Sequence, residues 1–175
     1  AKLRTFKLAL AATAEYSQFH IDQAGVGSGT DTQKIAAVMA AITTTMTRVN
    51  AVFENDVALT MVLVANSDQL IYLDSTTDPY TNGDGGTMLG ENQTNIDAII
   101  GTANYDIGHV FSTGGGGVAF LNSPCSSSKA GGVTGQSNPV GDTFDIDFVA
   151  HEMGHQFGAT HTFNGDAGSC SGNRS

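Results

Sequence analysis

Three histidines and a glutamate near the end of the chain have the spacing of a catalytic metal site. From His151 the sequence is HEMGHQFGATH, in which His155 follows after four residues and His161 after six more. On a helix, residues four apart lie on the same face, so the first two imidazoles can bind one ion. Gly158 can adopt the positive φ that ends a helix and brings His161 back as a third ligand. The pattern predicts a Zn²⁺ site with one coordination position open to water.

Glu152 lies next to the first histidine and is predicted to be the general base. Zinc lowers the pKa of a bound water to about 7, so a nearby carboxylate can accept its proton and pass it to a leaving amine. The chemistry specified is hydrolysis of a polarised carbonyl. A helix face that is rich in histidine by chance is the alternative, but it has no need for the Gly158 turn or for a third histidine.

The motif HEMGHQFGATH resembles the zinc-binding consensus of the metzincin metallopeptidases. Longer stretches, NYDIGHVFSTGGGGVAF and DIDFVAHEMGHQFGATHTFNG, are similar to secreted bacterial proteases of the reprolysin, or adamalysin-like, type. The resemblance implies a zinc endopeptidase acting on protein or peptide substrates, with His151, His155 and His161 as ligands and Glu152 as base. It also implies an edge strand above the cleft that pairs with the substrate. The candidates for this substrate-binding strand are Gly117, Val118, Ala119 and Phe120.

In this family a methionine-containing turn lies under the zinc, downstream of the third histidine. All five methionines of this chain precede His161. We therefore expect residues 1–175 to form a single catalytic domain that consists of the upper, N-terminal subdomain and the third-ligand loop, with the lower subdomain missing and further C-terminal domains in the full-length protein. Two alternatives to an active protease remain open: a binding or adhesion module with structural zinc, and an inactive autolytic fragment of a larger protease.

The spacing of apolar residues predicts the elements that position the motif. Residues 2–13 alternate as a strand does. From 32 to 53, apolar residues recur every three or four positions, which predicts a long helix capped by Thr30 or Asp31. Further strands are predicted at 57–65, 69–74, 105–112, 117–121 and 132–134, the first two joined by a hairpin turn at 66–68.

Two more helices are predicted, a short one at 91–100 and the active-site helix. The active-site helix begins near Asp142, which together with Asp145 approximates a capping box. The fold class is α+β with αβα layers: a zincin-like, twisted mixed sheet of about five strands with an antiparallel edge strand, and about three helices.

Charge and composition exclude several classes of partner. The chain has 17 acidic and 7 basic side chains and a formal net charge of −10, which repels nucleic acid and anionic lipid. The longest apolar runs, 35–42 and 57–65, are shorter than the ~20 residues of a membrane-spanning helix. Cysteine usage and the absence of an initiator methionine favour a secreted, extracellular protein. A bacterial origin is what the resemblance to bacterial reprolysin-like proteases implies.

Three other groups of residues have weaker functional interpretations. Cys125 and Cys170 are predicted to form a disulfide that braces the third-ligand loop; otherwise Cys170 pairs with a downstream cysteine, or both are free. A loop with oxygen ligands suggests Ca²⁺, but its spacing is not that of an EF-hand and solvated acids are the favoured interpretation. These residues are Asp74, Asp78, Asn82 and Asp84. His109 is interpreted as a buried histidine with satisfied hydrogen bonds.

Overall fold

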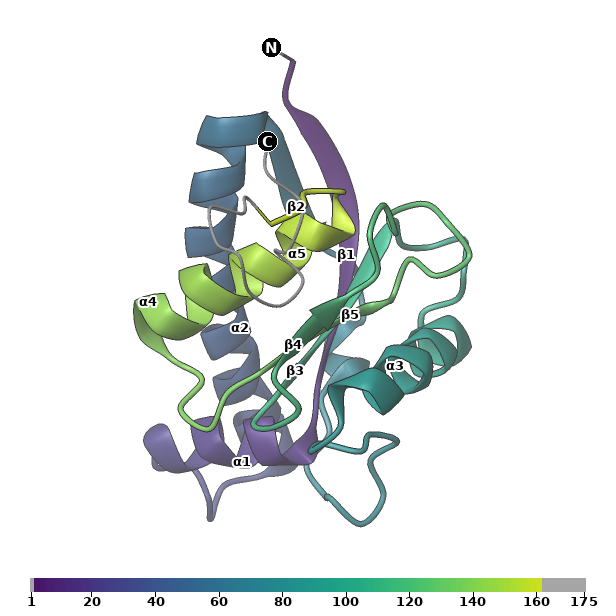
Figure 1. Ribbon diagram of the computed structural model, residues 1–175. Helices are drawn as coiled ribbons and strands as arrows, with labels where there is room; N and C mark the ends of the chain where they lie inside the picture. The colour runs from purple at the N-terminus through teal and green to yellow at the C-terminus, as the bar shows by residue number, and fades with distance from the viewer. Residues whose placement is uncertain (1, 162–175) are drawn as a thin grey trace, which may run out of the picture.

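The computed structural model describes residues 2–161, and within them a five-stranded sheet lies at the centre of the molecule (Figure 1). Its strands are β1 (Arg4–Ala12), β2 (Leu59–Leu63), β3 (Ile107–Ser112), β4 (Gly117–Ala119) and β5 (Gly132–Gly135). Their order across the sheet is β2-β1-β3-β5-β4. All neighbours are parallel except β4, which is antiparallel to β5. The predicted mixed sheet with an antiparallel edge strand is confirmed.

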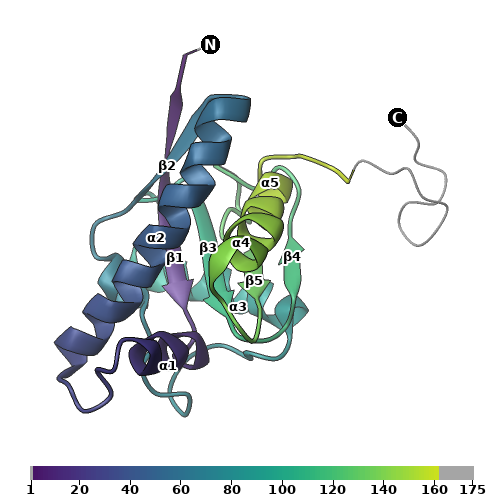
Figure 2. The ribbon, with the colours of Figure 1, turned by 90° about the vertical axis from the view of Figure 1, so that its left-hand side faces the viewer.

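Helices cover both faces of this sheet. They are α1 (Ala14–Gln23), α2 (Asp31–Val57), α3 (Gly85–Ile99), α4 (Gly141–Phe144) and α5 (His151–Gln156). Leu8 and Leu10 of β1 pack in one core with residues of α2 and α5, whereas Ala9 and Ala11 pack in a second core with residues of α3. Because successive side chains of a strand point to opposite faces, this alternation creates the three αβα layers seen in Figures 1 and 2.

The long helix α2 begins at the predicted position. The side chain of Thr30 accepts a hydrogen bond from the backbone N–H of Gln33 at 3.3 Å, and the Gln33 side chain accepts one from the Thr30 N–H at 2.9 Å. This reciprocal capping box satisfies two backbone donors at the helix start. By length and composition α2 is apolar enough to cross a membrane, although its longest uninterrupted apolar run is only residues 35–42. A core helix has the same property, and the apolar face of α2 packs on the sheet here.

The predicted hairpin between residues 57 and 74 is wrong. Strand β2 runs parallel to β1, and a short 3₁₀ helix, Ser67–Leu70, follows it in place of a turn and a second strand. Ile71 makes only an isolated bridge with Ala12. Two helices also differ from prediction. Helix α1 was not predicted, and α3 begins at Gly85, where the Asp84 side chain accepts a hydrogen bond from the Thr87 N–H at 3.1 Å.

The outer edge of β2 is covered by a side chain of α2. Asn50 donates to the backbone carbonyl of Met61 at 2.8 Å and accepts from its N–H at 2.9 Å. Strand β2 pairs with β1 through Ala58 and Val64, so the N–H and C=O of Met61 point away from the sheet. The Asn50 carboxamide thus occupies the positions that another strand would use.

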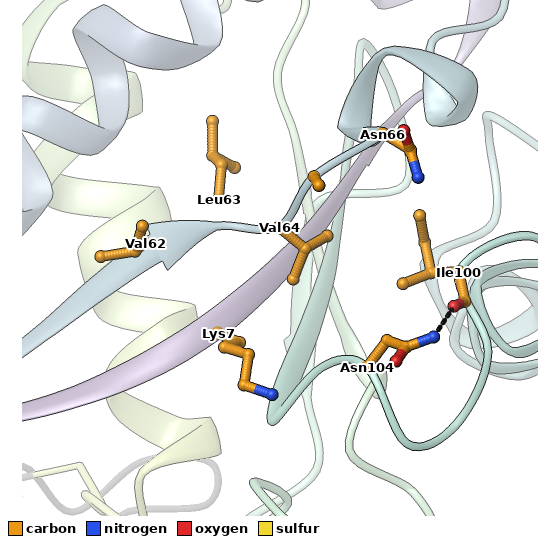
Figure 3. Close-up of a pocket in the computed structure, with 8 residues that line it drawn as sticks. Lys7, Val62, Leu63, Val64, Asn66, Ile100 and Asn104 are labelled. Atoms are coloured by element: carbon orange, nitrogen blue, oxygen red, sulfur yellow. Dashed lines mark hydrogen bonds between the residues drawn. The ribbon is translucent and has the colours of Figure 1, made fainter.

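Helix α3 covers one face of the sheet but leaves part of that face open near β2. Beyond the end of α3 lies a groove lined by Lys7, Val62, Val64, Ile100 and Asn104 (Figure 3). The Asn104 side chain donates to the carbonyl of Ile100 at 2.6 Å. Lys7 is opposite Val62 in the strand register, on the face of the sheet that packs against α3. The groove therefore lies on the other side of the sheet from α5 and His151.

Helix α1 buries His20, and this burial should make stability depend on pH. The side chain is 8% exposed, and burial lowers the pKa of His20 from 6.5 to about 4, although a hydrogen bond to the carbonyl of Pro139 opposes the shift. Below pH 6.5 the unfolded chain binds a proton at His20 that the folded chain does not bind. We therefore expect stability to fall between about pH 6.5 and 4, with His20 accounting for about 2 kcal/mol of the loss by pH 5.

Urea unfolding of the wild type and of His20→Gln at pH 7.5 and pH 5 measures this effect. All other titrating groups are shared, so the stability of the variant should fall less on acidification. An equal loss in both proteins would show that His20 is solvated in the folded state.

Candidate metal centre

The helix that carries the histidines is anchored to α2 by a buried carboxylate. Between α4 and α5 the chain forms a π-helical turn, Asp145–Ala150. Asp145 is 3% exposed; it accepts hydrogen bonds from the hydroxyl of Thr45 at 2.7 Å and from the guanidinium of Arg48 at 2.9 Å. Arg48 also forms an ion pair with Asp142. The predicted capping box is wrong, because both aspartates bind α2 and the helix begins after Val140 without a side-chain cap.

The three predicted histidines converge through their Nε2 atoms. The Nε2 atom of His155 lies 3.0 Å from that of His151 and 2.9 Å from that of His161, and the remaining pair is 2.9 Å apart. His151 and His155 are one turn apart, and Gly158, with φ +97°, reverses the chain so that His161 returns to them. The cluster is open to solvent, with His151 and His161 exposed and His155 half-buried.

The position of the proton on the His155 imidazole suits a metal ligand. Its Nδ1 atom lies 2.7 Å from the carbonyl oxygen of Ala159. A carbonyl only accepts, so Nδ1 carries the proton and the Nε2 lone pair faces the other two imidazoles. Burial, and secondarily the charges of His155 and His161, lower the pKa of His151. The neutral form that binds metal is therefore favoured, and three imidazole nitrogens suit a divalent ion such as zinc.

The side chain of Glu152 extends from α5 towards the edge strand β4 of the sheet. Its side chain is 7% exposed, and burial raises the pKa of this carboxyl, against the opposing influence of His155. The carboxylate touches the backbone of β4 so closely that a Cβ on Gly117 would lie 2.3 Å from Oε1. A buried carboxylate with a raised pKa is typical of a group that exchanges protons with substrate or water.

Within residues 2–161, the strand β4 presents a free edge beside the Glu152 carboxylate. Hydrogen bonds from the Phe120 N–H to Gly131, at 2.9 Å, and from the Gly135 N–H to Gly116, at 3.0 Å, show that even-numbered residues face β5. Gly117 and Ala119 therefore direct their N–H and C=O groups away from the sheet. The strand is shorter than predicted and ends at Ala119, so the half-exposed ring of Phe120 lies just beyond it, and Val118 packs towards the α3 side.

His109 is fully buried, as its interpretation as a core histidine requires. Its ring nitrogens lie 2.8 Å from the Gln156 Oε1 atom and 2.8 Å from the Thr134 hydroxyl. Burial lowers the pKa of His109 to about 4, so the ring is neutral near pH 7. The sequence reasoning missed Gln156 and Thr134. The position of Gln156, immediately after His155, was the one available signal.

Two weaker predictions concern residues away from this cluster. Cys125 is exposed, and Cys170 lies outside the described residues, so their pairing stays a prediction. The structure does not support a calcium site in this loop, because the side-chain oxygens of these residues accept hydrogen bonds from neighbouring groups of the same chain. The acceptor–donor pairs are Asp74 with Thr76, Asp78 with Ala14 and Tyr80, Asp84 with Thr87, and Asn82 with Thr13 and Thr113.

The layered fold and the histidine cluster define a metzincin-like metallopeptidase. A family model described as metallo-peptidase family M12B, reprolysin-like, matches residues 39–162, and the chain belongs to this family. A comparison with curated proteins gave no match. The match contains all three histidines, Glu152 and the strand β4. Membership implies metallopeptidase chemistry on protein or peptide substrates.

Proposed function

We propose that the protein is a zinc-dependent endopeptidase in which His151, His155 and His161 hold the metal and Glu152 is the general base. Bound zinc would polarise the scissile carbonyl and acidify a water molecule. The Glu152 carboxylate accepts the proton of the attacking water and delivers it to the nitrogen of the leaving amine. The observation that carries the proposal is the convergence of three Nε2 atoms within 3.0 Å of one another beside this buried carboxylate.

We propose further that the free edge of β4 binds the substrate as an extended strand. The outward N–H and C=O groups of Gly117 and Ala119 are available for main-chain pairing, which grips peptides of varied sequence. The carboxylate of Glu152, which comes from α5, lies against Gly117 at this edge, so a paired peptide would lie beside the base. Val118 packs β4 against the core on the α3 side of the sheet. The exposed ring of Phe120, just beyond the end of β4, offers the substrate an apolar contact.

A catalytic role for the metal is favoured over a purely structural one. Two of the three histidines are exposed and the third is half-buried, so the cluster is open to solvent. A zinc ion that holds a fold together is enclosed by its four ligands, whereas a catalytic ion keeps an open position. We also propose that residues 1–175 form one catalytic domain, the upper subdomain and third-ligand loop of a protease, and that the protein acts outside the cell.

Metal analysis combined with a peptidase assay tests the proposal. We expect one zinc per chain, hydrolysis of internal bonds in a mixed peptide library, and loss of this activity with 1,10-phenanthroline that added zinc reverses. Circular dichroism should show a folded chain throughout. Folded protein that binds no zinc would overturn the proposal, and unfolding on chelation would support the binding module with structural zinc. Zinc binding without any hydrolysis would support the inactive fragment.

A further inference from the structure

The side chain of Gln156 points into the core, where its amide contacts His109 and Gly108 of β3. It follows the ligand His155 and is completely buried. Its amide nitrogen donates to the carbonyl of Gly108 at 2.9 Å and to the hydroxyl of Ser123 at 3.2 Å. Its oxygen lies 2.8 Å from Nδ1 of His109. The ligand helix is thus joined by side-chain hydrogen bonds to β3 and to the segment after β4.

The partners of Gln156 determine the proton positions in this network. The Gly108 carbonyl only accepts, so the amide nitrogen of Gln156 must face it and the amide oxygen must face His109. That oxygen accepts, so Nδ1 of His109 carries the proton and Nε2 accepts from the Thr134 hydroxyl at 2.8 Å. One arrangement of protons therefore satisfies all the members of the network, with His109 neutral.

The network includes a residue of β5, the strand that pairs with the edge strand β4. Thr134 of β5 is the register partner of Gly117 in β4, and Gly132 is the partner of Ala119. A Cβ on Gly132 would lie 2.3 Å from the Gln156 oxygen, so β5 has no room to move closer to α5. The hydrogen bonds oppose separation, and the close packing opposes approach.

We propose that Gln156, His109 and Thr134 are positioning residues that fix α5 against β5, and thereby fix Glu152 and the histidines relative to the edge of β4. This inference rests on the proposed peptidase function. Gln156 is adjacent to a ligand, and Thr134 lies opposite the glycine that Glu152 touches, so one hydrogen-bonded chain connects both sides of the site. Groups that are hydrogen-bonded to metal ligands commonly change metal affinity 10- to 100-fold when they are removed. This network acts through the backbone of α5, where Gln156 follows His155, so we expect an effect at the low end of that range.

Thr134→Val tests the inference, because valine keeps the shape of threonine and removes the hydroxyl. We expect about 10-fold weaker zinc binding in competition with a chelator, shifted visible bands of the cobalt-substituted protein, and a fall in kcat with little change in KM. Thr134→Ser retains the hydroxyl and should restore wild-type values. Thr47→Val makes the same change on the exposed side of α2, where the hydroxyl binds only the Thr43 carbonyl, and should have no effect on these quantities.

The ring nitrogens of His109 provide a readout that needs neither metal nor activity. Nitrogen-15 chemical shifts of the zinc-free protein should show the proton on Nδ1, so they test the network even if the peptidase proposal fails. A proton on Nε2 would overturn the inference. So would a Thr134→Val protein that is less stable but has wild-type zinc affinity and cobalt spectrum. If Thr134→Val does not fold, Ser123→Ala is the second test, because it removes one hydrogen-bond acceptor of Gln156. It should weaken zinc binding and shift the cobalt spectrum as Thr134→Val is expected to do. Unchanged zinc affinity and an unchanged spectrum would overturn the inference.

Discussion

Replacing Glu152 by glutamine is expected to leave zinc bound and to lower kcat by about 10²-fold or more. Glutamine has nearly the shape of glutamate, so it fits the same space against Gly117, but it cannot accept a proton from water near neutral pH. The three imidazoles are unchanged by the substitution. The measurement is steady-state hydrolysis of a peptide, together with the zinc content of the same preparation.

Glu54→Gln is the matched control for this prediction. It makes the same chemical change on the exposed surface of α2, away from the histidines, and should have wild-type kcat and zinc content. If Glu152→Gln cleaves peptides at the normal rate with zinc in place, a group other than Glu152 is the base.

Adding one methyl group at Gly117 is expected to lower kcat by an amount on the order of 10²-fold, because the base is displaced from its working position. The new Cβ would lie 2.3 Å from Oε1 and 2.7 Å from Cδ of Glu152, so the carboxylate must move. The backbone φ of Gly117 is not positive, so alanine causes no backbone strain there. Pairing of the substrate with the outward backbone groups remains available, so KM should change little.

Gly83→Ala is the control for Gly117→Ala, because its new Cβ has nothing within 4 Å and its φ is also not positive. Both variants should unfold at similar urea concentrations. Wild-type kcat in Gly117→Ala would mean that Glu152 reacts from a position other than the one seen against β4.

The parts of the fold that sequence predicts well are those that local patterns determine. The apolar spacing of α2 and its Thr30 cap are such patterns, and both are confirmed. The segment after β2 was predicted wrongly because its turn-forming residues also suit other structures. Asn66, with φ +64°, leads into a 3₁₀ helix, and the parallel pairing of β2 with β1 is a tertiary property that no local signal contains. Helix α1 is polar and has no clear apolar stripe, so periodicity does not reveal it.

The same distinction applies to the candidate site. The three histidines and Glu152 lie within eleven residues, and helix geometry with one glycine turn is enough to bring them together. The network behind them joins His109, Thr134 and Gln156, which come from three segments far apart in the chain. Each of these residues is common in proteins, and only the folded sheet places them in contact.

The covering of β2 by Asn50 has a consequence for how the molecule meets other polypeptides. A sheet has two borders, and at the β2 border the backbone groups of Met61 are already bonded to a side chain of the same chain. Among the described residues the β4 border has no such clamp at Gly117 or Ala119. An incoming strand would have to displace Asn50 at Met61 but no side chain of residues 2–161 at Gly117 or Ala119, which favours pairing at the border where Glu152 lies. If substrate pairs with the β4 edge as proposed, self-association through the same edge would compete with it, and a dimer formed in this way would be inhibited.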